Sequence, residues 1–335
     1  MHIGSHYRIG TFLFWTRRNI LKLFLWAVFP TVLYGVFDLK WLAIPWQPVA
    51  LVGTAAAFIA GFKNTQTYGR LWEARKIWGA IVNDSRTWGI MSRDFIVDTN
   101  SSKEDLHPIH KRLIYRHIAW LTALRFQLRQ PKPWENMDRP HAKEFRKRYS
   151  VPEWESQIQE QMRPYLSKED MDHVLQKKNR ATQLLALQSM DLRELRKKGL
   201  IGEYPYVGME SVLKDFFTHQ GRAERIKNFP YPRQFASINM FFIVLFSILV
   251  PFGMLDEFAK LGEYGVWLTI PFSVVVGWVF TSLEQVGEST ENPFEGGAND
   301  IPMAALSRTI EIDLREMLDE TDLPPNVEPV DEILM

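Results

Sequence analysis

Four long apolar runs divide the chain into membrane-like and water-soluble parts. They cover about residues 20–37, 41–62, 235–255 and 264–283, and the last three contain no charged residue. Each is close to the roughly 20 residues with which an α-helix crosses the hydrocarbon core of a bilayer. Buried core helices of a soluble protein are the alternative, but four such long runs disfavour it. The pattern predicts an all-α membrane protein with four transmembrane helices.

The second run passes into a charged helical pattern without a turn signal between them. Residues 63–79 mix basic, acidic and aromatic side chains at helical spacing directly after Phe62. We therefore expect one helix to leave the membrane and continue into water. Pro45 and Pro48 interrupt the beginning of the run, and proline disrupts the helical hydrogen-bond ladder. The helix is accordingly expected to start after Pro48.

Basic residues gather on one side of the predicted spans. They precede the first run, follow the second and precede the third, whereas the loops within the two hairpins carry few basic residues: Arg17, Arg18, Lys63, Arg70, Arg222, Arg225 and Arg233. Cytoplasmic flanks of transmembrane helices carry an excess of Lys and Arg. The sequence thus predicts an integral protein of the inner (plasma) membrane with both chain ends in the cytoplasm.

This topology divides the chain into four parts. They are residues 1–62 with two spans, 63–233 as a large cytosolic helical domain, 234–284 with two further spans, and 285–335 as a cytosolic helix and tail. Helical spacing of apolar residues predicts soluble helices at about 108–128, 154–166, 168–198, 209–227 and 303–318. No alternating strand pattern of useful length is present. The last dozen residues are acidic and contain proline, so we expect them to be extended.

Composition and motifs argue against an enzyme. The chain has no cysteine, which excludes disulfides, thiolate nucleophiles and cysteine-ligated metals. Its net charge of +1 gives no sign of nucleic-acid binding. Phosphate-binding loops, nucleophile elbows and the H-E-x-x-H zinc motif are absent. His107, His110 and His117 lie close in sequence, but no carboxylate has matching helical spacing, so a metal site is disfavoured.

One face of the second run stands out. Gln47, Leu51 and Ala55 recur every four residues and therefore lie on the same side of a helix. Such a face of small and mid-sized residues is either a packing seam between helices or the lining of a pore. No charge lies deep inside a span, which disfavours a proton-coupled carrier. A water path along the axis of a ring of subunits, each contributing this helix, is a simpler arrangement than a carrier within one subunit.

Three blocks of the chain resemble the bacterial branch of the bestrophin family. The blocks are residues 61–79, residues 220–230, and residues 291–314 with the motif Glu291-Asn292-Pro293-Phe294. The resemblance implies a homopentamer in the lipid bilayer, with one axial pore and passive conduction of chloride and other small anions. Some bacterial members are cation-permeable, so a cation channel is one alternative. A membrane-anchored scaffold or receptor that does not conduct is another.

The resemblance also implies where the pore narrows. By register through Pro48 and Lys63, the family's apolar neck falls on Gln47, Leu51 and Ala55. Gln47 is polar and Ala55 is small, which should widen or wet the neck and leave Leu51 as its narrowest apolar ring. A second constriction in the cytosolic helices falls near Gln183 or Leu184.

Animal members of the family carry an acidic calcium clasp after the Asn-Pro-Phe motif. In the matching stretch here only Glu295 and Asp300 are acidic, as in a vestige of that clasp. Calcium sites take six to eight oxygen ligands, several of them carboxylates. The sequence therefore argues against calcium activation, and we expect no cofactor besides the permeant ion.

Overall fold

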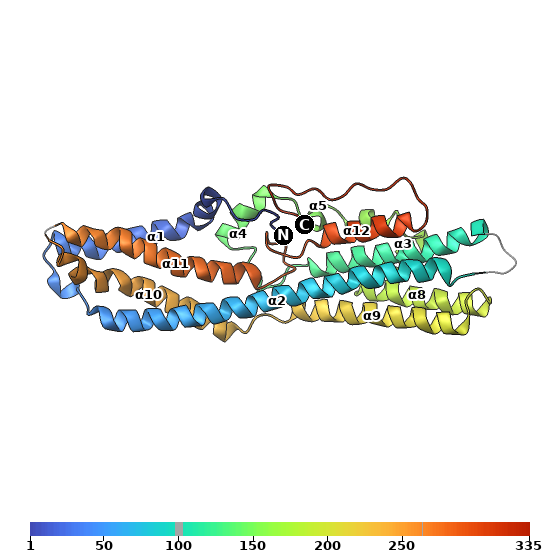
Figure 1. Cartoon of the computed structure of the whole chain (residues 1–335), viewed down its shortest axis with the longest axis horizontal. Helices are drawn as coiled ribbons and strands as arrows, with labels where there is room; N and C mark the ends of the chain where they lie inside the picture. The colour runs from blue at the N-terminus through green and yellow to red at the C-terminus, as the bar shows by residue number, and fades with distance from the viewer. Residues whose placement is uncertain (98–102, 263) are drawn as a thin grey trace.

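The computed structural model is a long, narrow bundle of helices (Figure 1). It describes residues 1–97, 103–262 and 264–335. Over these residues the only β-structure consists of isolated bridges, such as that between Ile96 and Ile201. The predicted all-α fold class is therefore confirmed for the part of the chain that the structure describes.

One end of the bundle is rich in apolar helices. The helices at this end are α1 (Ile9–Gly35), the first part of α2 (Trp46–Asp94), α10 (Arg233–Ala259) and α11 (Thr269–Thr290). In the described residues, three segments are long and apolar enough to cross a membrane: Lys40–Asp94, Arg233–Ala259 and Gly265–Thr290. The helix α1 packs along α11 and α10 but carries Arg17, Arg18 and Lys22 in its first half.

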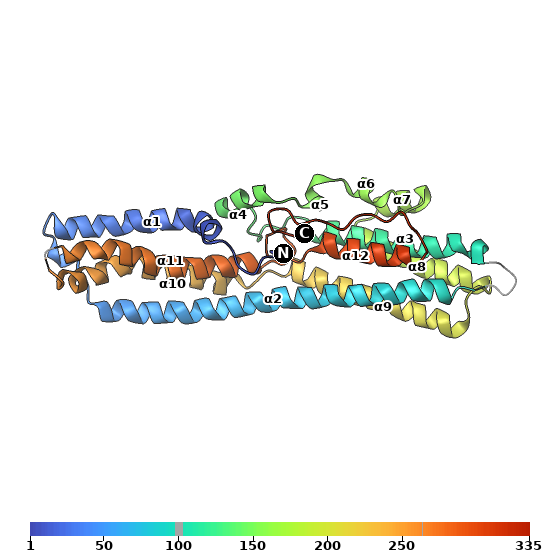
Figure 2. The same cartoon turned by 45° about the horizontal axis from the view of Figure 1, so that its top comes forward.

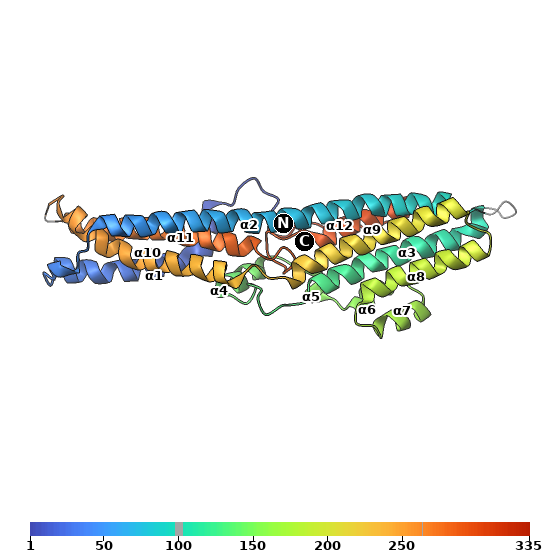
Figure 3. The ribbon, with the colours of Figure 1, turned by 90° about the horizontal axis from the view of Figure 1, so that it is seen from below.

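The helix α2 is continuous over 49 residues and joins the apolar end to the soluble end, as Figures 2 and 3 show. This confirms that one helix leaves the apolar region and continues into a charged one. Its predicted start after Pro48 is wrong, because α2 begins at Trp46 and Pro48 lies in the first turn. Backbone N–H groups of the first turn have no partner inside the helix, so proline is tolerated there.

The soluble end consists of the distal half of α2 with α3 (Lys103–Leu128), α8 (Arg180–Lys197), α9 (Glu203–Asn228) and α12 (Met303–Glu316). Its core contains the fully buried side chains of Trp78, Trp88, Trp120 and Phe216. His117 lies among these rings and its Nε2 is 2.8 Å from Ser85 Oγ. Burial lowers the pKa of His117 to about 3, so the imidazole is neutral. It is a core residue, consistent with the disfavoured metal site.

Two predicted helices are divided in the structure. The segment 154–166 contains only the end of α5 (Pro152–Glu155) and α6 (Ile158–Met162), and 168–198 contains α7 (Lys168–Leu175) and α8. The break before α8 follows from an N-cap, since the Asn179 side chain accepts a hydrogen bond from the N–H of Thr182. The remaining short elements are η1 (Lys40–Leu42), α4 (Pro140–Phe145), η2 (Arg146–Arg148) and η3 (Gly265–Leu268).

The C-terminal tail returns along its own subunit and ends beside the N-terminal segment near the middle of the bundle (Figures 1 and 2). The tail is not helical, as expected from its composition. Ile333 and Met335 are buried, and the carbonyl of Met335 accepts a 2.7 Å hydrogen bond from the N–H of Ala305. The tail therefore belongs to the junction between the apolar and soluble ends.

Candidate functional site

The predicted neck residues lie on a free face of α2. The opposite side of α2 is a buried stripe that faces α10 and α11. It contains Val49, Gly53, Ala56 and Ala60. Gln47, Leu51 and Ala55 lie away from that stripe, and all three are exposed in the single subunit. The Leu51 side chain is 72% exposed. The face is therefore available to another subunit, to lipid or to a water path.

Larger apolar side chains continue the same face toward the soluble end. Phe58 lies seven residues beyond Leu51, is 77% exposed, and is followed by the exposed Phe62. Next come Thr65 and Gln66, which are exposed and polar. The free face of α2 thus changes from apolar to polar near Phe62. It carries no nucleophile or acid–base pair, so its chemistry fits passage or contact.

The two residues predicted at a cytosolic constriction have different environments. Leu184 is fully buried in the hydrophobic core of the soluble end. Its side chain cannot line a pore from that position, so the predicted role of Leu184 in a constriction does not agree with the structure. Gln183, the preceding residue on α8, is half-buried. A helix turns by about 100° per residue, which is why neighbours differ so much in exposure.

A buried ion pair joins the membrane helices where the apolar run of α2 ends. Lys63 Nζ lies 2.7 Å from Glu284 Oε1 of α11, and Asn239 Nδ2 of α10 donates to the other carboxylate oxygen. Lys63 is 2% and Glu284 9% exposed. A Cβ on Gly287 would fall 2.4 Å from Asn64 Oδ1, so glycine permits this approach of α11 to α2.

Sequence reasoning missed this pair, although a signal for it exists. Lys63 is the first charge after the second apolar run, and Glu284 is the first after the fourth. Because the two runs end on the same side of the predicted membrane, residues of opposite charge there can meet.

Glu295 and Asp300, the predicted vestige of a calcium clasp, are both buried. Glu295 Oε2 accepts a 2.8 Å hydrogen bond from the N–H of Asn136 and a 3.1 Å bond from the Asn292 side chain. Asp300 Oδ2 accepts a 2.7 Å bond from the N–H of Gly296. Burial raises the pKa of Asp300 to about 6, and burial together with the charge of Asp300 raises that of Glu295 well above its usual value.

Arg129 supplies the positive charge at this site. Its Nη1 lies 3.2 Å from Asp300 Oδ2, its Nε lies 3.4 Å from Glu153 Oε2, and its Nη2 donates to the carbonyl of Ile301. Arg129 and Asp300 are almost inaccessible to solvent. Two carboxylates, one of them bound to a guanidinium, do not make the six to eight oxygen ligands that calcium takes. The residues present do not fit a calcium site.

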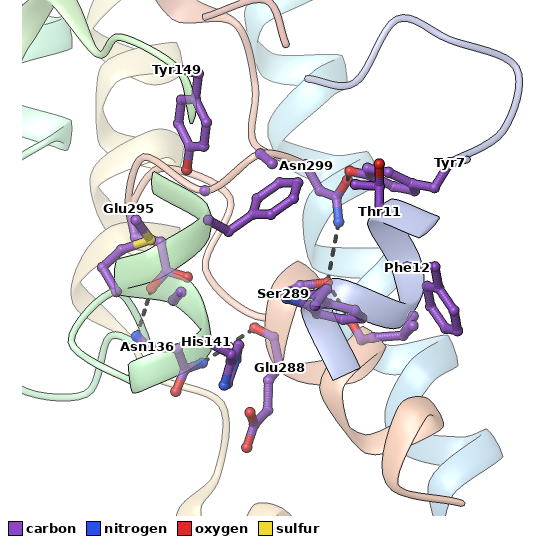
Figure 4. Close-up of a pocket in the computed structure, with 17 residues that line it drawn as sticks. Tyr7, Thr11, Phe12, Asn136, His141, Tyr149, Glu288, Ser289, Glu295 and Asn299 are labelled. Atoms are coloured by element: carbon purple, nitrogen blue, oxygen red, sulfur yellow. Dashed lines mark hydrogen bonds between the residues drawn. The ribbon is translucent and has the colours of Figure 1, made fainter. Parts of the chain in front are cut away.

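A cavity of about 240 Å³ lies next to the clasp, between the first turns of α1, the α4 segment and the end of α11 (Figure 4). Its wall is mainly aromatic and apolar, with Tyr7, Phe12, Trp15, Phe145 and Tyr149 among the lining residues. Glu288 also lines it, but its carboxylate forms a 2.5 Å ion pair with Arg139. The cavity is therefore a mostly apolar space at the junction of the two ends.

Comparison with known proteins places this architecture in a family. A family model described as "Bacterial/Fungal Bestrophin protein" matches residues 15–316. The chain belongs to this bestrophin family. The match includes the free face of α2, the Lys63–Glu284 pair and the clasp. The bestrophin resemblance expected from three sequence blocks is therefore confirmed.

Named relatives and solved structures agree with this assignment. The chain is 27% identical over 282 residues to the voltage-dependent anion channel-forming protein YneE of Escherichia coli K12, covering 84% of this chain and 80% of that protein. It is 26% identical over 277 residues, or 82% and 78%, to RSc3414 of Ralstonia nicotianae, which has the same description. A crystal structure of a bestrophin homologue from Klebsiella pneumoniae has a TM-score of 0.74 at 24% identity, covering 90% of this chain and 98% of that one.

These findings establish two general properties of this bestrophin. Its fold is that of the solved membrane-protein homologues, one of which gives a TM-score of 0.76 at 23% identity, over 92% of this chain and all of that one. Together with the three apolar helices, this makes the chain an integral membrane protein. The family is one of channels and gives no indication of enzymatic activity.

Proposed function

We propose that this bestrophin is the subunit of a homopentameric channel that conducts chloride and other monovalent anions along an axis lined by α2. The observation that carries the proposal is the free face of α2, on which Gln47, Leu51 and Ala55 are exposed although they lie in an apolar segment. Hydrophobic constrictions of this kind gate ion flow by dewetting. The described function of the relatives as anion channel-forming proteins supports the same reading.

In this proposal α1 is the fourth transmembrane helix. Its second half is apolar and exposes Leu25 and Phe29, as a lipid-facing helix would. The Trp26 indole donates a 3.1 Å hydrogen bond to the Ile248 carbonyl of α10, which holds α1 against the other membrane helices. Lys22 can extend its amine to the membrane surface.

The same proposal places both chain ends in the cytoplasm and the protein in the inner (plasma) membrane. The basic residues that flank the apolar end support this orientation. Arg233 is the first residue of α10, and Arg17 and Arg18 form ion pairs with Glu144 of α4, which lies near the middle of the bundle (Figure 1). The pore needs no cofactor besides the permeant ion, and nucleic acid has no part in it. The tail would remain on its own subunit, because it already binds there.

Recording from the purified protein in planar bilayers tests the function. In a tenfold KCl gradient, a chloride-selective pore should reverse near the chloride potential, about 59 mV from zero for a monovalent ion. Chelating calcium should leave the current unchanged, because Arg129 already neutralises Asp300. A reversal potential of opposite sign would identify a cation channel. No current from intact pentamers would favour the scaffold.

Substitutions in the neck should change conduction in opposite directions. Leu51→Ala should raise the open probability or conductance several-fold, because a narrow apolar ring is where water and ions are excluded. Ala55→Phe should lower it by adding a second bulky ring one turn away. Leu25→Ala is the matched control, since Leu25 is 61% exposed on α1 and should leave currents unchanged. Unaltered single-channel currents in both neck variants would show that this face does not line the pore.

A further inference from the structure

The free face of α2 carries an unneutralised positive charge beyond the membrane. Lys76 lies 25 residues after Leu51 and 18 after Phe58, which is about seven and five full turns of helix. Its side chain therefore points in nearly the same direction as theirs, about 38 Å farther along the helix from Leu51. Lys76 is exposed. A pore lined by Leu51 would pass Lys76 in its cytosolic part.

Charges close to Lys76 do not cancel it. Glu73, one turn earlier on α2, forms a 2.5 Å ion pair with Arg225 of α9. Among the residues that the structure describes, Lys76 forms no ion pair, and neither does its exposed neighbour Arg75. Arg222 lies three residues before Arg225 on the same face of α9 and is likewise exposed without an ion pair in the described part. The region is therefore net positive.

A single exposed lysine is ordinarily only a solvated side chain. Five lysines around one axis are different, because rings of Lys or Arg attract anions into a pore and low-dielectric walls focus their field. We propose that Lys76 from each subunit forms a ring in the cytosolic vestibule that concentrates chloride below the neck. This inference rests on the proposed function, because it requires α2 at the axis.

Salt dependence distinguishes such a ring from a structural effect. Fixed charges act over the Debye length, which is about 30 Å at 0.01 M salt and about 3 Å at 1 M. The ring should therefore raise anion conductance at low salt and have almost no effect at high salt. Since Lys76 has no described partner, replacing it should leave the fold and the assembly intact.

The experiment compares Lys76→Glu with Arg75→Gln and Lys76→Gln in planar bilayers at 0.01 M and 1 M KCl. Lys76→Glu should lower chloride conductance roughly tenfold at 0.01 M, the lower end of the range for electrostatic focusing, and leave it unchanged at 1 M. Lys76→Gln should have an intermediate effect. Arg75→Gln removes the same charge about 100° around the helix and should change little. Gel filtration and melting curves verify that each variant is assembled.

Each other result has a defined meaning. Equal losses in Lys76→Gln and Arg75→Gln would overturn the ring, because general surface charge would then account for the effect. Normal low-salt conductance in Lys76→Glu would overturn it directly while leaving the channel itself intact. No current from the assembled wild-type protein would instead overturn the proposed function, and the ring with it.

Discussion

Replacing Lys63 with alanine should lower the free energy of unfolding by about 3–5 kcal/mol, the usual cost of leaving one partner of a buried ion pair uncompensated. Glu284 is 9% exposed and would retain only the hydrogen bond from Asn239. Because the pair connects α2, α10 and α11, the loss should loosen the membrane helices together. Thermal or denaturant unfolding of the detergent-solubilised protein measures the effect.

Two companion variants show whether charge is the cause. Lys63→Met with Glu284→Leu removes both charges and should recover most of the lost stability, since a buried pair can often be replaced by apolar residues. Lys76→Ala removes an exposed lysine from the same helix and should change stability by less than about 0.5 kcal/mol. A double variant as unstable as Lys63→Ala would contradict the explanation and indicate that shape matters more than charge.

Arg129→Met should be comparably destabilising near neutral pH, by about 3–5 kcal/mol. The substitution keeps a flexible apolar chain of similar length and leaves the carboxylates of Glu153 and Asp300 buried without their guanidinium. Arg125 still donates a 2.6 Å hydrogen bond to Glu153, so most of the lost stability should come from the uncompensated carboxylate of Asp300. Melting temperatures of wild type and variant at pH 7.5 give the comparison, with the exposed Arg75→Met as control.

Acid should partly restore Arg129→Met. The folded-state pKa of Asp300 is about 6, above its ordinary value near 4, because burial disfavours the charged form. Protonation therefore favours the folded state fully below about pH 4, and this contribution is lost as the pH rises through 6. Without Arg129 the pKa should rise further, so the deficit should shrink between pH 7.5 and pH 5. Adding Asp300→Asn should remove that pH dependence. A deficit that is constant with pH would contradict this assignment.

Features that depend only on residues close together in the sequence were largely predictable. The length of α2 could be inferred because no proline or strong turn signal separates its apolar and charged halves, and the single Gly61 at the junction does not end the helix. Its first residue could not, since Pro48 is compatible with either the first turn or a break. Residues four apart on α2 share a face, so the sequence predicted a common environment for Gln47, Leu51 and Ala55. Whether that environment was a packing seam or a pore lining could not be decided from the spacing alone.

Features that depend on distant segments could not be read in the same way. The environment of Arg129 is made by Glu153, Asp300 and Ile301, which come from separate parts of the chain. Nothing in the spacing of these residues indicates that they meet. The same holds for Leu184, whose burial depends on how α8 packs against α3 and α9. The helical period predicts on which face of its helix a residue lies, but it does not predict which other segments cover that face.

The unbroken course of α2 has a mechanical consequence. Forty-nine residues at 1.5 Å each make a rod of about 74 Å, so a tilt of about 5° at one end displaces the other by roughly 6 Å. Such a rod has no hinge at which motion could be absorbed. In the proposed channel, a stimulus that shifts the soluble end of α2 would therefore also tilt its membrane end, and the two ends of the proposed conduction path would move together.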